Sequence, residues 1–501
     1  MKKSNNPWKP IFVFIFASIL LLSCFTVLAT DNLNLLPKNS NNAVGLNTLS
    51  SVETAGVPAK VVVTCTPPKI LADNSYHYDV IKVELQDLYG NPAYAPEGGV
   101  GVSLSSSDPT VGTTSGSLII SEGETYTGTY FQSTSKPGQT TIEATATTTT
   151  VEGLPLVPSS AVMTTVGAKP YKVQVILAPN NVLADDTYYY YPVIVQLQDS
   201  SGNPAYAPFS IGVSLASSAP AIGTVPNYLT IWQGETFEAT WFRSTSIQGE
   251  TTITAEAAGL VGTNETMTTV APGTDPETKL VVWLAPNKIQ ADSSSEYYPI
   301  IIEIQDGSGR PVSASSDITV SLSSSNETVG SVPDSLTISS GDEFGYQYFT
   351  STYVPGDTII MASAANLTSD SATMTTVGYT PTQLAIYIAP SIVFAHRETS
   401  YNAIVVQVQD GNGNPARAPQ GGITAVMTSS NASIGDTDTT ITIYEGETEE
   451  YTRFESTYRP GQTIITASSA TLVSGSKVMK TVAPEPIKLG IDLALPKVLA
   501  N

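Results

Sequence analysis

One short motif occurs four times in this chain, and its spacing limits the possible folds more than any other feature. The copies are QDLYGNPAYAP, QDSSGNPAYAP, QDGSGRPVSAS and QDGNGNPARAP, which begin at Gln86, Gln198, Gln305 and Gln409. They recur at intervals of about a hundred residues, which is the size of whole domains and far above the period of solenoid repeats. The sequence therefore predicts a row of similar domains.

The copies, together with the MTTV-like segment that closes each unit, set the expected domain boundaries. The predicted organisation is a signal peptide or signal anchor at 1–29, a flexible linker at 30–56, repeats at 57–167, 168–272, 273–378 and 379–484, and the start of a fifth repeat at 485–501. The fifth start rests on KLGIDLALPKVLAN from Lys488, which aligns with KVQVILAPNNVLAD from Lys172. We expect either that the sequence is a fragment of a longer protein or that this last strand completes a neighbouring domain.

Within a repeat the pattern is that of short strands separated by turns. In the first repeat the expected strands are VVVTC from Val61, VIKVEL from Val80, GVGVSL from Gly99, SLII from Ser117, YTGTYF from Tyr126, TTIEATA from Thr140 and VMTTV from Val162. Seven short runs at this spacing, without a sustained helical period, are typical of a β-sandwich. The predicted fold class is all-β, with tandem immunoglobulin-like sandwiches in an elongated array behind an N-terminal hydrophobic segment.

The second of these runs shows the clearest alternation of apolar and polar residues. Ile81, Val83 and Leu85 share one face, and the polar side chains between them, at 82, 84 and 86, share the other. This period of two predicts that the first face lies in the core and that the second faces solvent. Each copy of the motif then continues with glycine and proline, which predicts a tight reversal where strand pairing ends.

Charge and cysteine content narrow the setting. With 44 acidic and 22 basic residues, the formal net charge of −22 argues against a nucleic-acid partner, because binding to phosphates needs clustered Lys and Arg. The hydrophobic content of 41% is enough for each repeat to bury its own core. Of the two cysteines, Cys24 lies in the leader, so only the thiol of Cys65 remains and stability must come from packing.

The first thirty residues predict export. Lysines precede an uncharged apolar run from Ile11 to Ala29, and Val27-Leu28-Ala29 fits the small-residue rule for cleavage before Thr30. The run is also long enough to remain as an uncleaved membrane anchor, and the segment that ends at Cys24 offers lipoprotein processing as a further alternative. The predicted location is secreted or cell-surface, with membrane contact only through this segment or an anchor outside the chain.

The motifs of the repeats resemble those of bacterial immunoglobulin-like domains of the invasin and intimin type. LADNSYHYDVIKVELQDLYGNPA and STSKPGQTTIEATA carry the resemblance, through an alanine-aspartate start, a D-x-x-G-N-P turn and a late strand. The central segment ISEGETYTGTYF departs from that pattern and is more like other surface immunoglobulin-like repeats. The resemblance covers residues 57 to 484. It implies a β-sandwich, extracellular placement and a role in stalks, but it transfers no binding residue.

The sequence gives little support to catalysis. His77 and His396 lie in different repeats, and we interpret both as solvent-facing loop residues. No cofactor is expected except for possible Ca²⁺ at repeat junctions, with recurring aspartates as the candidate ligands. The candidates are Asp73, Asp87, Asp185, Asp199, Asp292, Asp306 and Asp410. The alternative, which we favour, is that these aspartates cap turns through backbone amides.

Two further groups of residues suggest contacts at the surface. Tyr188 to Tyr191, Trp232 and Trp241 would bind sugar rings if exposed, although alternation along a strand favours core and cross-strand positions for most of them. N-x-S/T sequons predict possible N-glycosylation at Asn264, Asn326, Asn366 and Asn431.

The function expected from all of this is a non-enzymatic extracellular spacer or adhesion stalk. Its partner would be a surface receptor, a glycan or a component of the cell envelope, which the sequence does not identify. The alternative is an accessory or carbohydrate-binding segment of a larger surface enzyme whose working domain lies beyond residue 501.

Overall fold

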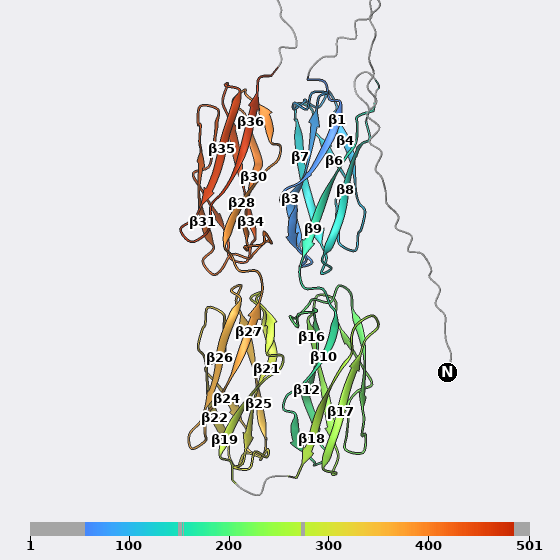
Figure 1. Ribbon diagram of the computed structural model, residues 1–501, viewed down its shortest axis with the longest axis vertical. Helices are drawn as coiled ribbons and strands as arrows, with labels where there is room; N and C mark the ends of the chain where they lie inside the picture. Colours follow the sequence, from blue (N-terminus) through green and yellow to red (C-terminus); the bar gives the residue numbers. More distant parts are fainter. Residues whose placement is uncertain (1–55, 149–152, 154, 272–275, 485–501) are drawn as a thin grey trace, which may run out of the picture. The chain divides into compact units, whose positions relative to one another are not determined.

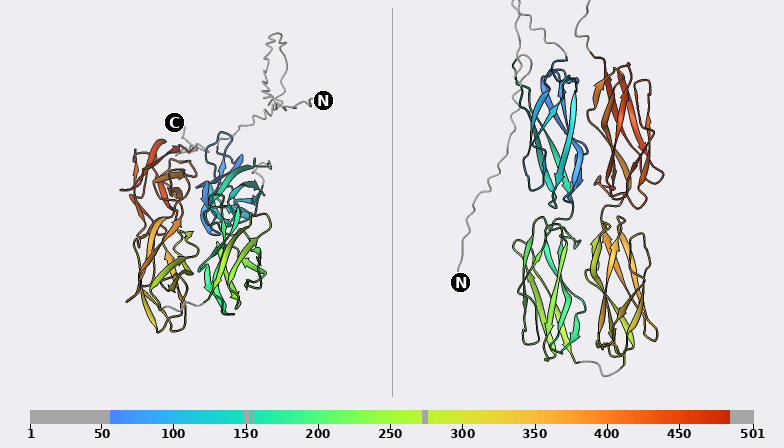
Figure 2. Two further views of the ribbon diagram at one scale, coloured as in Figure 1. Left: turned by 60° about the horizontal axis from the view of Figure 1, so that its bottom comes forward. Right: turned by 180° about the vertical axis from the view of Figure 1, so that it is seen from behind.

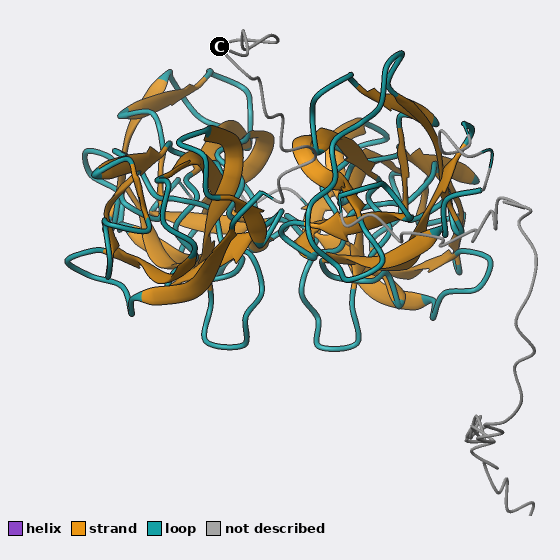
Figure 3. Cartoon of the chain, turned by 90° about the horizontal axis from the view of Figure 1, so that it is seen from above, coloured by secondary structure: helices purple, strands orange, loops and turns teal. Residues whose placement is uncertain are grey.

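The computed structural model describes residues 56–148, 153, 155–271 and 276–484 of the chain (Figure 1). The predicted signal segment at 1–29, nearly all of the predicted linker at 30–56 and the predicted fifth start at 485–501 lie outside the described residues. Strands and loops make up the described part, which contains no helix (Figure 3). It therefore includes no helix long and apolar enough to cross a membrane.

Repeat 1 is a sandwich of two sheets. Its strands are β1 (Lys60–Cys65), β2 (Lys69–Leu71), β3 (Tyr76–Gln86), β4 (Val100–Ser106), β5 (Gly112–Thr114), β6 (Ser117–Ile120), β7 (Tyr126–Ser133), β8 (Gly138–Ala146) and β9 (Ser159–Val166). The four-stranded sheet has the order β1-β3-β7-β5, and the five-stranded sheet has the order β2-β9-β8-β4-β6. Neighbouring strands are antiparallel, except that β2 runs parallel to β9.

The same plan recurs three more times (Figure 2). Repeat 2 contains β10 (Lys172–Leu177), β11 (Asn181–Leu183), β12 (Tyr188–Gln198), β13 (Ile211–Ser217), β14 (Gly223–Thr224), β15 (Tyr228–Ile231), β16 (Phe237–Ser244), β17 (Gly249–Glu256) and β18 (Thr263–Val270). Repeat 3 contains β19 (Lys279–Leu284), β20 (Lys288–Gln290), β21 (Ser295–Gln305), β22 (Ile318–Ser324), β23 (Gly330–Ser331), β24 (Ser335–Ile338), β25 (Phe344–Ser351), β26 (Gly356–Ser363) and β27 (Asp370–Val377). Repeat 4 contains β28 (Gln383–Ile388), β29 (Ile392–Phe394), β30 (Thr399–Gln409), β31 (Ile423–Ser429), β32 (Gly435–Thr437), β33 (Thr440–Ile443), β34 (Glu449–Ser456), β35 (Gly461–Ser468) and β36 (Gly475–Val482).

Each repeat closes its own apolar core between its two sheets. In repeat 1 the inward residues of β3 pack against Ile142 and Met163 of the opposite sheet, around the fully buried ring of Phe131. The ring lies so close to Gly112 that an added Cβ there would be 2.3 Å from the Phe131 Cζ. Because a side chain at this position would collide with the core, glycine is required next to the ring. Phe242, Phe349 and Phe454 occupy the equivalent place in the other repeats.

The predicted tight reversal follows each long strand. Asp87 N donates to Asn91 O at 2.9 Å, Gly90 has a φ of 83°, and Gln86 forms an isolated bridge with Pro92. Glycine accepts this left-handed backbone without steric cost. The reversal thus ends the strand at the same residue in every repeat, which keeps the inward side chains in register.

The predicted fold class of tandem all-β immunoglobulin-like sandwiches is confirmed. All seven expected runs of repeat 1 are strands, and the structure adds the short strands β2 and β5. A cis X-Pro bond follows the first strand of every repeat, at Thr66-Pro67, Ala178-Pro179, Ala285-Pro286 and Ala389-Pro390.

Candidate functional site: the paired sheet faces

The outer face of the four-stranded sheets is buried, although an outer face would ordinarily lie in solvent, and we call it the pairing face. It consists of the outward side chains of β3, β12, β21 and β30 and of the strands beside them. On β3, Lys82 is 3% exposed and Glu84 is 7% exposed, and the residues at the equivalent positions of the other repeats are buried as well. The prediction that this face is in solvent is therefore wrong, because residues of another repeat cover it.

The covering residues are identified by contacts between repeats that are far apart in sequence. Gln407 Nε2 of repeat 4 donates to the backbone oxygen of Lys69 in repeat 1 at 2.9 Å. In the same way, Gln196 Nε2 of repeat 2 donates to the backbone oxygen of Lys288 in repeat 3 at 2.8 Å. Both glutamine side chains are fully buried. Repeat 1 therefore contacts repeat 4, and repeat 2 contacts repeat 3.

The contact between repeats 2 and 3 has an apolar centre. Ile194 and Ile301, both on the pairing face, pack together with Ala178 and Ala285 in one buried cluster. Partly buried side chains surround this cluster, namely Ile176, Phe237 and Ala239 from repeat 2 and Trp283, Phe344 and Tyr346 from repeat 3. Removing such apolar surface from water stabilises the contact by roughly 25 cal/mol per Å² buried.

The contact between repeats 1 and 4 is instead built around charges. Asp73 Oδ2 accepts from Arg417 Nη2 at 2.7 Å, and His77 lies 3.5 Å from the other Asp73 oxygen and 3.3 Å from Glu449 Oε1. Burial alone would lower the pKa of His77, but hydrogen bonds and the charges of Asp73 and Glu449 raise it to about 9. Burial would also raise the pKa of Asp73, yet His77 and Arg417 lower it to about 2. His77 and Asp73 are therefore both charged at neutral pH.

Beside these centres, two kinds of hydrogen bond link the repeats, and each kind occurs once in both pairs of repeats. Tyr206 of repeat 2 donates to Asp292 of repeat 3 at 2.7 Å, as Arg417 of repeat 4 does to Asp73 of repeat 1. Lys288 Nζ donates to Asn203 Oδ1 at 3.4 Å, and Lys69 Nζ donates to Asn414 Oδ1 at 3.2 Å. The two pairs of repeats are thus held by the same set of positions.

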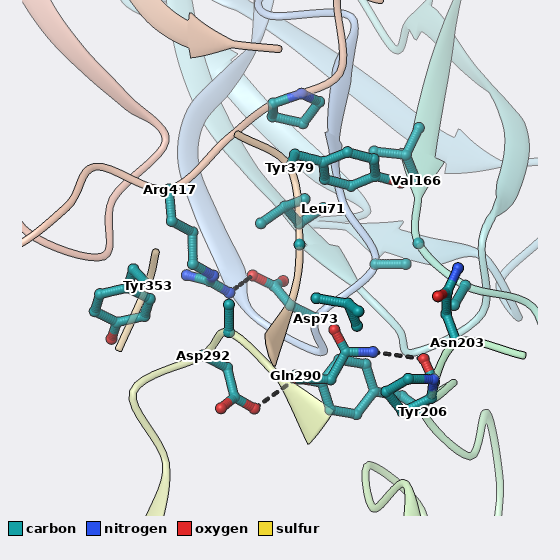
Figure 4. Close-up of a pocket in the computed structure, with 18 of the residues that line it drawn as sticks. Leu71, Asp73, Val166, Asn203, Tyr206, Gln290, Asp292, Tyr353, Tyr379 and Arg417 are labelled. Carbon is teal, nitrogen blue, oxygen red and sulfur yellow. Dashed lines mark hydrogen bonds and ion pairs between the residues drawn. The ribbon is translucent and has the colours of Figure 1, made fainter. Parts of the chain in front are cut away.

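A pocket of about 320 Å³ lies where residues of all four repeats meet (Figure 4). Its lining includes Asp73, Tyr206, Asp292, Tyr353 and Arg417, and the Arg417 guanidinium lies 5.7 Å from the centre of the Tyr353 ring. The charged side chains labelled in the figure have partners among the labelled residues, since Arg417 pairs with Asp73 and Tyr206 donates to Asp292. These groups serve the contact between repeats, and we assign no ligand to the pocket.

The aspartates proposed as calcium ligands mostly have hydrogen-bond partners in the protein. Asp87, Asp199, Asp306 and Asp410 each accept backbone amides two and four residues ahead, at 2.8 to 2.9 Å, as the turn-capping interpretation predicts. Asp73 and Asp292 lie at the contacts just described, and Asp185 accepts from Ser244 at 2.9 Å. Within the described residues no three His, Cys, Asp or Glu side chains gather as a metal site would require. Calcium binding remains a prediction.

The interpretation of the two histidines as solvent-facing loop residues is wrong for His77. His77 lies within β3, and its side chain is only 9% exposed because repeat 4 covers it. His396 follows β29, is half-buried, and its Nε2 lies 3.1 Å from the Tyr94 hydroxyl of repeat 1. Both histidines therefore belong to the contact between repeats 1 and 4.

The tyrosines and tryptophans that the sequence singled out in repeat 2 are more exposed than we expected. Of the four consecutive tyrosines only Tyr189 is buried, whereas Tyr188, Tyr190 and Tyr191, and also Trp232, are all more than 40% exposed. The expected cross-strand contacts do occur, since the Tyr188 ring meets the Trp241 ring edge-on at 5.3 Å and Arg243 lies over Tyr188 at 5.1 Å. The expectation of mostly core positions is wrong because a bulge between Tyr189 and Val193 breaks the alternation of β12.

The sequon asparagines and Cys65 are the remaining residues that the sequence singled out. The sequon asparagines, Asn264, Asn326, Asn366 and Asn431, are all exposed, so glycosylation stays a prediction that the surface permits. Cys65 is a free, buried cysteine, and burial raises the pKa of its thiol to about 12. A thiol protonated at neutral pH and covered by the core is unreactive.

No family model and no curated protein matches this chain. Among solved structures it is similar to domains 1–6 of the surface layer protein SbsC, at 16% identity and a TM-score of 0.24, covering 86% of this chain and 54% of that one. It is also similar to invasin, a bacterial integrin-binding protein, at 15% identity and a TM-score of 0.27, covering 84% of this chain and 79% of that one. The D0-D1 domain of intimin matches at 14% identity and a TM-score of 0.16, covering 41% and 98%.

These matches concern the fold. The chain shares a likeness of fold with invasin and intimin, the type of protein whose motifs its repeats resemble. The chain spans about half of the SbsC structure that it matches.

Proposed function

We propose that this chain is an extracellular or cell-surface structural element, in which immunoglobulin-like repeats act as a spacer or adhesion stalk. The proposal includes the domain organisation given above, with a signal at 1–29, a linker at 30–56, four repeats from 57 to 484 and a fifth start at 485–501. We assign no catalysis to these residues. The partner would be a surface receptor, a glycan or a component of the cell envelope.

One observation carries this proposal, which is that each of the four repeats has a closed core of its own. Covalently linked domains of this kind extend a chain without requiring a partner, a metal or a disulfide for their fold. Apolar contacts hold repeat 2 against repeat 3, and charged contacts hold repeat 1 against repeat 4. The similar solved structures come from a surface layer protein and an integrin-binding protein, and we place this chain in the same setting.

The location is tested with antibodies raised against residues 54–501 and applied to intact and to lysed cells of the native host. We expect labelling of intact cells and loss of the epitope after brief external protease treatment. An epitope that becomes accessible only after lysis would refute the surface location.

The structural role is tested by single-molecule pulling on residues 54–501. Four closed cores predict four separate unfolding events, preceded by an event at lower extension when the contacts between repeats open. A single event that releases the whole length would contradict independent repeats.

The exposed aromatic residues of repeat 2 favour a second candidate, a carbohydrate-binding accessory segment. Tyr188 and Tyr190 are exposed and their rings lie 6.5 Å apart at an angle of 23°, which is an arrangement on which sugar rings can stack. This candidate predicts binding on a glycan array that is lost in Tyr188→Ala. Absence of binding by the parent protein would leave only the structural role.

A further inference from the structure

The contacts between repeats are made by residues of the repeats themselves and not by the segments that connect them. The residues joined are far apart in sequence, with 344 positions between Asp73 and Arg417 and 92 between Gln196 and Lys288. Contacts of this kind do not require the two repeats to belong to the same chain. A second copy of the protein presents the same residues in the same geometry.

The repeats also fall into two complementary types. Repeats 2 and 4 supply a glutamine that donates to the backbone oxygen of a lysine in repeat 3 or 1, and an asparagine that accepts from the amine of the same lysine. They also supply Tyr206 or Arg417, which donates to an aspartate of repeat 3 or 1. At the glutamine position repeats 1 and 3 carry Glu84 and Glu303. Each contact therefore joins one even-numbered repeat with one odd-numbered repeat.

The two contacts differ in chemistry, which restricts the choice of partner further. Repeat 1 has Lys82 where repeats 2 and 3 have Ile194 and Ile301, and the amine of this lysine is 3.4 Å from Asp79. Asp79 in turn accepts from Asn402 of repeat 4 at 2.8 Å. Opposite repeat 2, Lys82 would keep Asp79, which belongs to its own repeat, but Asp79 would lose the Asn402 amide and the lysine would lie against an apolar cluster. Repeat 1 therefore prefers a repeat 4.

We propose that the pairing face is a self-association surface, through which two copies of this chain bind each other by pairing repeat 1 of one copy with repeat 4 of the other. In the single chain the face of repeat 1 is covered by its own repeat 4, and in the associated form repeat 4 of the second copy takes that place. At high protein concentration, the second arrangement links neighbouring copies. The inference concerns the chain itself and does not rest on the surface location proposed above.

A charge exchange between two variants tests the proposal. In Asp73→Arg, repeat 1 would place an arginine against Arg417 of its own chain, and in Arg417→Asp, repeat 4 would place an aspartate against its own Asp73. Neither variant satisfies the contact alone. A mixture restores an ion pair, but only between two chains, because the arginine introduced in the first variant then meets the aspartate introduced in the second.

The measurement is sedimentation of residues 54–501, which form one compact unit, after refolding the two variants separately and together. We expect a species of twice the mass in the mixture that is absent from either variant alone. The matched control exchanges an ion pair within repeat 1, Asp108→Lys mixed with Lys136→Asp, whose partners lie 3.3 Å apart on one sandwich. That mixture should remain monomeric. A charge-exchange mixture that sediments as the sum of its two components would overturn the proposal.

A second measurement keeps the proposal testable if either charge variant fails to fold. Chains carrying only Tyr94→Cys are refolded together with chains carrying only His396→Cys, and a short bis-maleimide is added, since these two side chains meet between repeats 1 and 4. Cys65 does not interfere, because it is buried. We expect cross-linked dimers whose yield rises with concentration, and none when Glu256→Cys, on the exposed side of repeat 2, replaces the second variant. Equal yields with both partners would overturn the proposal.

Discussion

Glu303 should make the contact between repeats 2 and 3 sensitive to pH. Its side chain is fully buried on the pairing face, where one oxygen accepts from Trp283 Nε1 and Gln305 Nε2, both at 2.8 Å. Its other oxygen has no hydrogen-bond partner among the described residues. At the same position of repeat 2, Gln196 donates its amide to a backbone oxygen of repeat 3. A carboxylate cannot donate in this way, but a protonated carboxyl group can.

The electrostatic surroundings of Glu303 agree with a protonated group. Burial raises the pKa of Glu303 from 4.5 to about 7, against the opposing effects of Trp283, Gln305 and Lys279, and the charge of Glu343 adds to the increase. A rise from 4.5 to about 7 corresponds to at most about 3 kcal/mol, at 1.36 kcal/mol for each pKa unit. Because the pKa is raised in the folded state, this contribution is complete below pH 4.5 and is lost as the pH rises through about 7.

The perturbation is Glu303→Gln, and the assay is urea unfolding of residues 54–501 at pH 5 and pH 8. Trp283 is the reporter, in a protein in which Trp232 and Trp241 are replaced by Phe. Between these two pH values the parent should lose roughly 2 to 3 kcal/mol more stability than the variant, because the glutamine has no proton to lose. Glu256→Gln, at an exposed position of repeat 2, is the matched control and should retain the pH dependence of the parent. If Glu303→Gln also retains it, the reasoning is refuted.

Three further predictions concern single positions. His77→Gln should remove stability that is present below pH 6.5 and lost as the pH rises through about 9, which is measured as a smaller difference between unfolding at pH 6 and at pH 10. Gly330→Ala should destabilise repeat 3 by about 1 to 3 kcal/mol, because the new Cβ would lie 2.2 Å from the Phe349 ring, whereas Gly307→Ala has open space and should be nearly neutral in thermal unfolding. Phe454→Ala should cost repeat 4 about 3 to 5 kcal/mol in urea unfolding and leave the unfolding of the other repeats unchanged.

The parts of the fold that depend on neighbouring residues could be predicted from the sequence. The inward face of β3 follows from strict alternation, and the reversal after it follows from one aspartate, one glycine and one proline. Both are determined within a few residues of the chain. The short strands β2 and β5 were missed, because three residues carry no periodicity that distinguishes a strand from a loop.

The pairing face could not be predicted in the same way, because the residues that cover it lie up to several hundred positions away. A signal was nevertheless present. Strands buried on both faces read as nearly continuous apolar runs, and Pro192 to Val195, Pro299 to Ile302 and Ala403 to Val406 are such runs. Repeat 1 conceals the pattern, since Lys82 interrupts it with a charge that pairs with Asp79 of the same repeat. An interpretation based on repeat 1 therefore places this face in solvent.

The polar residues of the buried face determine the partner more than they add stability. A buried glutamine that donates one hydrogen bond, or a buried glutamate that must first take up a proton, contributes less than an apolar side chain of the same size would. Their effect is instead to make pairing with the wrong repeat unfavourable. An even-numbered repeat opposite an odd one places a glutamine amide against a backbone carbonyl. Two odd-numbered repeats would place Glu84 and Glu303 where these amides stand, so that each buried acid would face a carbonyl without a proton to donate. Replacing both glutamates by glutamine should therefore weaken the choice of partner while it stabilises the fold at alkaline pH.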